Sequence, residues 1–155
     1  MSVSIPNEKY FESFKFFCEE FYGKFDCDES KYIKEKKAAR TMRGKDQEIE
    51  VWYIEDDRVV GVGKILPTLS IDAIEFGGNL SIDIFNRSMF LEEAIDVSIK
   101  FIQSFYPIER LLFTVKDDDY DLLLIMEERS AKPLSEGEVT RDGESFNVKR
   151  YNLEI

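Results

Sequence analysis

The apolar residues of this chain change their spacing at one clear point, between residues 84 and 89. From Leu80 to Ile84 apolar and polar residues alternate, which is the period of a strand with one buried face. After a short break at 85–88, apolar residues recur at steps of three and four from Met89 to about Tyr106, which predicts an amphipathic helix. Ser88 is well placed to cap the start of that helix. The residues of its predicted buried face are Leu91, Ala94, Ile95, Ser98, Phe101, Ile102 and Phe105.

The same periodicities predict helices and strands on both sides of this unit. Two strands joined by the turn Asp56-Asp57 precede it, and the segment Pro67–Glu75 after them is expected to be a loop. A nearly apolar strand, a helix and a hairpin closed by Asp142-Gly143 follow it. The expected helices are Lys9–Tyr22, about Lys31–Met42 and about Asp119–Ser130, and the expected strands are Glu48–Glu55, Arg58–Leu66, Arg110–Val115 and the two arms of the hairpin.

This order of elements resembles the fold of the GCN5-related N-acetyltransferases, and three segments also resemble that family's sequence motifs. Gly77–Ile84 is similar to its glycine-glycine strand, Leu111–Asp119 to its strand with an acidic loop, and Arg150–Glu154 to its closing strand. The resemblance covers roughly residues 49–155. It implies a single domain, residues 1–155, of the α/β (α+β) class. The implied architecture is an acyl-CoA N-acyltransferase-like fold, with a mixed, mostly antiparallel sheet and helices on both faces.

The resemblance also implies an activity, which is acetyl transfer from acetyl-CoA to an amine of a small molecule or a protein. In the family, the central strand positions the thioester and the loop after it binds the pyrophosphate. By this resemblance Glu75 is the candidate base and Tyr120 the candidate acid. The candidate cofactor-binding residues are Ile82, Ile84, Phe85, Arg87, Ser88, Met89 and Phe90.

The break after Ile84 departs from the family's pattern for binding the pyrophosphate. The family's loop, Arg/Gln-x-x-Gly-x-Gly/Ala, lets backbone N–H groups approach the anion closely. Here the break is shorter, and no glycine lies between Asn79 and Glu136. Glu92 and Glu93 also add negative charge early in the helix. This degenerate loop leaves two functions open. The chain is an acetyltransferase with lost or weakened activity, or a non-catalytic binding or regulatory module that acts through a protein partner.

The composition narrows the chemistry and the class of partner. The 155 residues are 43% hydrophobic and 34% charged, as is usual for one globular domain. The net charge of −11 argues against binding to nucleic acid or to anionic membranes. The absence of histidine excludes Ser-His-Asp and Cys-His nucleophiles and zinc sites that contain histidine. Two cysteines without a signal-peptide pattern lead us to expect a cytoplasmic protein.

Two charged segments and one aromatic segment allow more than one interpretation. The basic cluster from Lys31 to Lys45 is either a grip for an anion or an acidic partner, or a solvated helix face. The acidic residues from Asp117 to Glu128 match part of a calcium-binding loop, but Leu122 stands where that loop needs glycine. We therefore expect the aspartates to cap a helix, and we predict no metal site. Phe16 and Tyr22 fall off the predicted buried helix face, so they either line a ligand cleft or a partner surface, or pack beneath loops.

Overall fold

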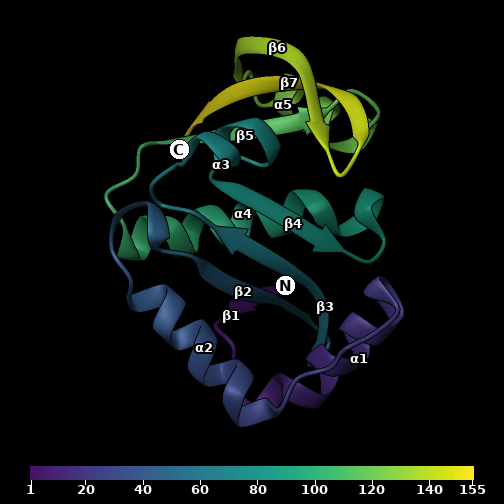
Figure 1. The fold of residues 1–155 in the computed structure, drawn as a ribbon. Helices are drawn as coiled ribbons and strands as arrows, with labels where there is room; N and C mark the ends of the chain where they lie inside the picture. The colour runs from purple at the N-terminus through teal and green to yellow at the C-terminus, as the bar shows by residue number, and fades with distance from the viewer.

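The computed structural model describes residues 1–155, and its strands form two antiparallel sheets (Figure 1). The first sheet has the strand order β1-β2-β3-β4, and the second has the order β5-β7-β6. The strands are β1 (Ser2–Ser4), β2 (Ile49–Glu55), β3 (Arg58–Ile65), β4 (Leu80–Ile84), β5 (Arg110–Lys116), β6 (Lys132–Arg141) and β7 (Glu144–Glu154). The helices are α1 (Phe11–Tyr22), α2 (Glu29–Thr41), α3 (Ile71–Phe76), α4 (Arg87–Phe105) and α5 (Tyr120–Glu128), with 3₁₀ turns at Glu8–Tyr10 and Gly44–Asp46.

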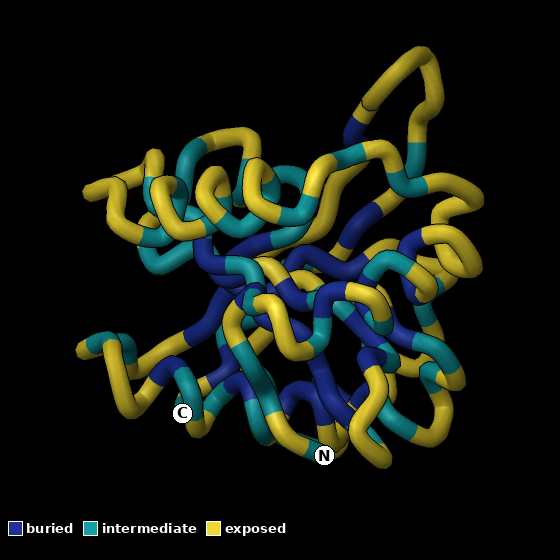
Figure 2. Tube along the Cα trace, turned by 90° about the horizontal axis from the view of Figure 1, so that it is seen from below, coloured by how far each residue is buried: buried dark blue, intermediate teal, exposed yellow.

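Two apolar cores lie on opposite faces of the first sheet. Val51 and Tyr53 of β2 belong to one core, whereas Trp52 and Ile54 of the same strand belong to the other. Because successive side chains of a strand point to opposite faces, this strand must be covered on both sides. Figure 2 shows the buried residues gathered in the interior, inside the exposed outer turns of the helices. The predicted α+β class, with mostly antiparallel strands and helices on both faces, is therefore confirmed, although the strands form two antiparallel sheets and not the one mixed sheet that was expected.

The core on one face is built around α1. Phe11, Phe14, Phe17 and Cys18 are its buried residues, and they recur at helical spacing. The ring of Phe14 stacks on the ring of Trp52 with the centroids 4.3 Å apart and the planes 12° from parallel. Burial raises the pKa of the Cys18 thiol to about 12, so this cysteine stays protonated and unreactive at neutral pH.

The core on the opposite face is built around α4, whose predicted buried face is confirmed except at its C-terminal end, where Phe101 is only partly buried and Phe105 is exposed. Leu91, Ala94, Ile95, Ser98 and Ile102 are its buried residues. The buried hydroxyl groups of Ser98 and Tyr53 lie 2.7 Å apart and share a hydrogen bond. The phenol fits because residue 63 is glycine: a Cβ atom at Gly63 would lie 2.2 Å from the Tyr53 oxygen. None of the helices has the length and apolar content that crossing a membrane requires.

The two sheets are joined at the start of β4. The backbone N–H of Asn79 donates to the carbonyl of Leu112 (2.8 Å), and its side-chain oxygen accepts from the N–H of Leu112 (2.7 Å). Its side-chain nitrogen donates to the carbonyl of Leu66 (2.8 Å). Gly78 has a φ of +77°, and a Cβ atom there would lie 2.1 Å from the carbonyl oxygen of Leu112. Beyond this contact β4 and β5 diverge (Figure 1).

The structure corrects two of the predicted boundaries. The segment predicted as a loop contains the short helix α3, and Ser70 caps it by accepting a hydrogen bond from the N–H of Ala73 (3.2 Å). Helix α4 begins at Arg87, so Ser88 lies inside the helix and is not its cap. The capping position belongs to Asn86, which has a φ of +48° and makes no side-chain capping bond. Asparagine tolerates this left-handed conformation better than most residues, which allows a very tight turn.

Candidate functional site

A cleft of about 290 Å³ opens between β4 and β5, at the place where the two strands diverge. Its buried lining is apolar apart from Thr114 and comes from both strands and from α4. Its exposed and half-buried lining includes four charged side chains. The buried apolar residues are Leu80, Leu91, Ile95 and Phe113, and the charged residues are Asp83, Arg87, Lys116 and Asp119.

One edge of β4 faces this cleft with backbone groups that no strand pairs. The other edge of β4 is paired with β3 along its whole length. Arg87 donates from Nη1 to the carbonyl of Ile82 at 3.4 Å, so that carbonyl points away from β3 and into the cleft. An unpaired strand edge is a template for an extended chain that carries amide groups.

An ion pair between Arg87 and Asp119 spans the mouth of the cleft. Nη2 of Arg87 lies 2.6 Å from both carboxylate oxygens of Asp119. Arg87 begins α4, shortly after β4 of the first sheet ends. Asp119 immediately precedes α5, shortly after β5 of the second sheet ends. Asp119 also caps α5 by accepting from the N–H of Leu122 (3.3 Å), which confirms the capping role predicted for this acidic segment. The pair therefore ties together the two halves of the molecule that the cleft separates.

The turn from β4 to α4 consists of two residues, Phe85 and Asn86. The ring of Phe85 packs edge-on against Phe17, with the centroids 4.8 Å apart, and also contacts Phe21. The backbone N–H of Phe85 donates to the carbonyl of Val60 (2.9 Å). The turn is thus fixed on the α1 side of the sheet, and it is neither long nor rich in glycine.

The two glutamates that follow in α4 share their cationic partners with other carboxylates. Glu92 lies 3.4 Å from Arg129, which also pairs with Asp96 at 2.8 Å. Glu93 lies 2.9 Å from the amino group of Met1, which also pairs with Glu55 at 3.1 Å. The charges of Glu92 and Glu93 are therefore only partly balanced, by groups outside the cleft.

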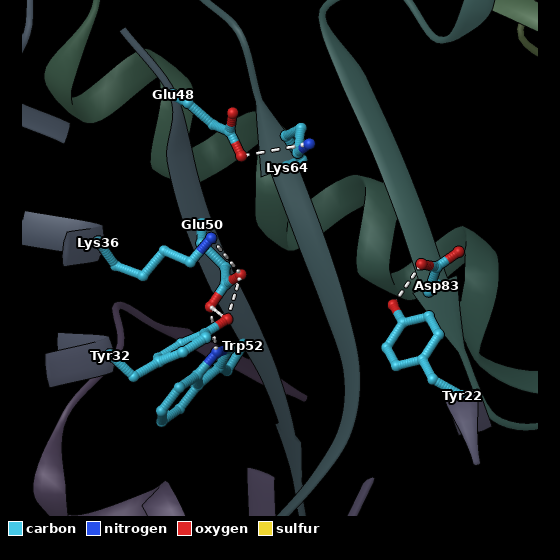
Figure 3. Close-up of polar contacts among 8 residues, drawn as sticks. All are labelled: Tyr22, Tyr32, Lys36, Glu48, Glu50, Trp52, Lys64 and Asp83. Atoms are coloured by element: carbon cyan, nitrogen blue, oxygen red, sulfur yellow. Dashed lines mark hydrogen bonds and ion pairs between the residues drawn. The ribbon is translucent and has the colours of Figure 1, made fainter. Parts of the chain in front are cut away.

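Asp83 and Tyr22 form a polar pair beside the cleft (Figure 3). The Tyr22 hydroxyl donates to Oδ2 of Asp83, and Asp83 also lines the cleft. Burial raises the pKa of Tyr22 above its ordinary value, and the carboxylate of Asp83 raises it further, so the phenol remains a donor at neutral pH. Sequence analysis did not identify Asp83, although its place on the polar face of β4 was a usable signal.

A second polar group lies on the same face of the first sheet (Figure 3). Glu50 accepts hydrogen bonds from the Tyr32 hydroxyl (2.7 Å) and from Nε1 of Trp52 (3.0 Å), and it pairs with Lys36 at 3.4 Å. Burial raises the pKa of Tyr32, and Glu50 raises it further. Because protein donors already satisfy Glu50, we assign it a structural role.

The structure brings some of the predicted site residues to the cleft and leaves others elsewhere. Ile82 and Arg87 line the cleft, whereas Glu75 on α3 and Tyr120 at the start of α5 do not. Tyr120 is 77% exposed. The other residues predicted to bind the cofactor do not line the cleft. Ile84 is buried in the core around α4, and Phe90 packs against that core and is partly buried. Phe85 packs against α1, and Ser88 and Met89 are exposed.

No group of three or more acidic or cysteine side chains gathers as a metal site would require. The acidic segment that matched part of a calcium loop instead continues into α5. Asp119, the residue that caps this helix, forms an ion pair with Arg87.

Comparisons with known proteins find similarity in structure but not in sequence. No protein-family model and no curated sequence matches the chain. An acetyltransferase from Salmonella typhimurium that modifies the N-terminal serine of ribosomal protein L7/L12 superposes with a TM-score of 0.69 at 9% identity, over 99% of this chain and 94% of the other.

Two further solved structures cover almost the whole chain. The microcin C7 self-immunity acetyltransferase, solved with acetyl-CoA and AMP, superposes with a TM-score of 0.69 at 11% identity, over 99% of this chain and 93% of the other. An acetyltransferase of the GNAT family from Streptococcus pneumoniae gives 0.54 at 12% identity, over 99% and 100%. The chain therefore has the fold of the GCN5-related N-acetyltransferases.

Proposed function

We propose that this chain is an N-acyltransferase that binds an acyl thioester in the cleft between β4 and β5 and transfers the acyl group to an amine. The cleft itself is the observation that carries the proposal. It combines an apolar interior, an unpaired edge of β4 and charged groups at its mouth. These features suit a thioester at the end of a chain of amide groups, which would lie along β4 as an added strand does.

The reaction needs one bond to form and one to break. The amine nitrogen attacks the thioester carbon, the C–N bond forms, the C–S bond breaks, and the sulfur leaves as a thiol once it has taken up a proton. Asp83 is our candidate for the group that accepts the amine proton, because it is the carboxylate at the cleft that no cation of the protein neutralises. Tyr22 orients it through the hydroxyl hydrogen bond. The roles of Glu75 as base and Tyr120 as acid stay predictions.

The amine acceptor that we favour is the N-terminus of a peptide or protein. The similar Salmonella typhimurium enzyme modifies an N-terminal serine, and the face that carries Asp83 is open to solvent beside the cleft. A peptide amine could approach along this face without entering the core.

The test is release of free thiol from acetyl-CoA, measured with a serine-initiated peptide and with spermidine as acceptors. We expect release that depends on the acceptor, and we expect Ser81→Trp to abolish it, because Ser81 is an exposed residue of β4 that lines the cleft. Ser104→Trp, at the exposed far end of α4, is the matched control and should leave release unchanged. If neither acceptor caused release of thiol from acetyl-CoA, this result would contradict the proposal.

A second candidate function is a non-catalytic module that acts through a protein partner. The two-residue turn after β4 and the neutralised Arg87 favour it, because both weaken the binding of a nucleotide. If this candidate is right, acetyl-CoA and simpler thioesters will neither bind in calorimetry nor raise the melting temperature. Saturable binding that Ser81→Trp removes would exclude it.

A further inference from the structure

We infer that the cleft recognises the acyl-pantetheine arm of a thioester donor but offers no binding site for a nucleotide diphosphate beyond it. This inference rests on the proposed function and names the class of donor that the site accepts. Acetyl-CoA consists of such an arm followed by a pyrophosphate and a phosphorylated adenosine. Donor recognition would then depend on the edge of β4 and the apolar interior, and hardly on phosphate.

The first reason is the shape of the turn after β4. Binding a pyrophosphate requires several backbone N–H groups to converge on it, which needs an open loop at the helix start. Here Phe85 and Asn86 complete the whole connection. Phe85 is held by its packing on Phe17 and by the bond from its N–H to Val60. The turn therefore cannot open without losing contacts of the core around α1.

The second reason is that the cation nearest to that turn is already used. Arg87 has one guanidinium nitrogen 2.6 Å from both oxygens of Asp119 and the other 3.4 Å from the carbonyl of Ile82. A phosphate would have to compete with a carboxylate that the fold holds in place, because Asp119 also caps α5. Arg87 thus behaves as part of the cleft wall and not as a free anion-binding group.

The third reason is the charge of the surroundings. The four charged side chains of the cleft, Asp83, Arg87, Lys116 and Asp119, add up to no net charge, although only Arg87 and Asp119 pair with each other. Close to the cleft, the exposed residues Asp117 and Asp118 of the loop after β5 and Asp121 of α5 add negative charge. Lys116 also lies over the ring of Phe146, with Nζ 4.5 Å from the ring centroid. A donor with several phosphate charges would meet a neutral to negative mouth, where Coulomb interactions oppose its binding.

The test compares the dissociation constants of acetyl-CoA and S-acetylpantetheine for the full chain by calorimetry. S-acetylpantetheine has the same thioester and amide groups but no phosphate. We expect acetyl-CoA to bind no more than about threefold tighter than S-acetylpantetheine, and weaker if the negative mouth repels its phosphates, since the phosphates make no favourable contact. Acetyl-CoA binding about a hundredfold tighter, as two charge-assisted hydrogen bonds would cause, would overturn this inference and leave the proposed function standing. Binding of neither donor would overturn both.

A substitution of the ion pair gives an independent check. Asp119→Asn removes the charge that holds Arg87, and asparagine can still cap α5. We expect the freed Arg87 to raise the affinity for acetyl-CoA about tenfold relative to the affinity for S-acetylpantetheine, so that the ratio of the two dissociation constants changes in favour of acetyl-CoA. Asp118→Asn, which removes an equal charge from the adjacent exposed residue, is the matched control and should change neither constant by more than about threefold. An equal gain for both donors, or an equal gain in both variants, would overturn the inference.

Discussion

At the scale of single residues, Gly78 and Asn79 decide where the two sheets meet. A side chain at Gly78 would collide with the carbonyl of Leu112. Asn79 is buried and makes four hydrogen bonds to backbone groups of two other segments, two from its side-chain amide and two from its own backbone. Both residues belonged to the segment that resembled the family's strand. What the sequence could not indicate was the partner, because Leu112 lies 33 positions away from Asn79.

Replacing Asn79 by alanine tests this junction. The substitution leaves the buried N–H of Leu112 and the partly buried carbonyl of Leu66 without their amide partner. We expect the free energy of unfolding to fall by roughly 3 kcal/mol, because each unsatisfied buried group costs about 1–3 kcal/mol. The measurement is urea denaturation followed by circular dichroism.

Asn147→Ala is the matched control, since Asn147 is exposed on β7 and its side chain makes no hydrogen bond in the structure. Its stability should stay within about 0.5 kcal/mol of the original chain. If Asn79→Ala were as stable as this control, Asn79 would not be what holds the sheets together.

At the scale of elements, periodicity predicted the long helices and the strands because each depends on an apolar face that its own sequence displays. It failed for α3, which has six residues. Such a helix is too short to be stable alone. It is held by Thr114 of β5 and Arg150 of β7, which both donate to the carbonyl of Ile74, and no local pattern reveals these partners.

The candidate site was predictable in part for the same reason. Ile82 and Arg87 were identified because they lie in or next to the strand that resembled the family's motif. The aspartates of the acidic segment were expected to cap a helix, but that Asp119 is the cap and that it pairs with Arg87 required the structure, because the pairing depends on how far β4 and β5 diverge. The pair of Asp83 with Tyr22 joins residues 61 positions apart and depends on where α1 ends, so it required the structure.

At the scale of the whole molecule, the acid–base behaviour follows from the absence of histidine and from buried phenols. No side chain with the ordinary pKa of histidine is present to change the charge near neutral pH. Tyr53 is fully buried, and burial raises its pKa above the ordinary 10.0 even though the Ser98 hydroxyl acts in the opposite direction. The unfolded chain can therefore ionise this phenol at a pH where the folded chain cannot.

This difference fixes the sign of the pH dependence. Because the folded pKa of Tyr53 is the higher one, its contribution to stability is complete below pH 10.0 and is lost as the pH rises above that value. We expect the free energy of unfolding to fall by about 1.4 kcal/mol per pH unit on account of this residue. Tyr53→Phe should make the total loss of stability between pH 9 and pH 11, measured by urea titrations, smaller by about 1.4 kcal/mol, because the unfolded phenol is only half ionised at pH 10.0. Ser98→Ala keeps the buried phenol and should keep the slope. If the free energy of unfolding fell with pH equally in the original chain and in Tyr53→Phe, the phenol would ionise in the folded protein. The core between β2 and α4 would then be open to water.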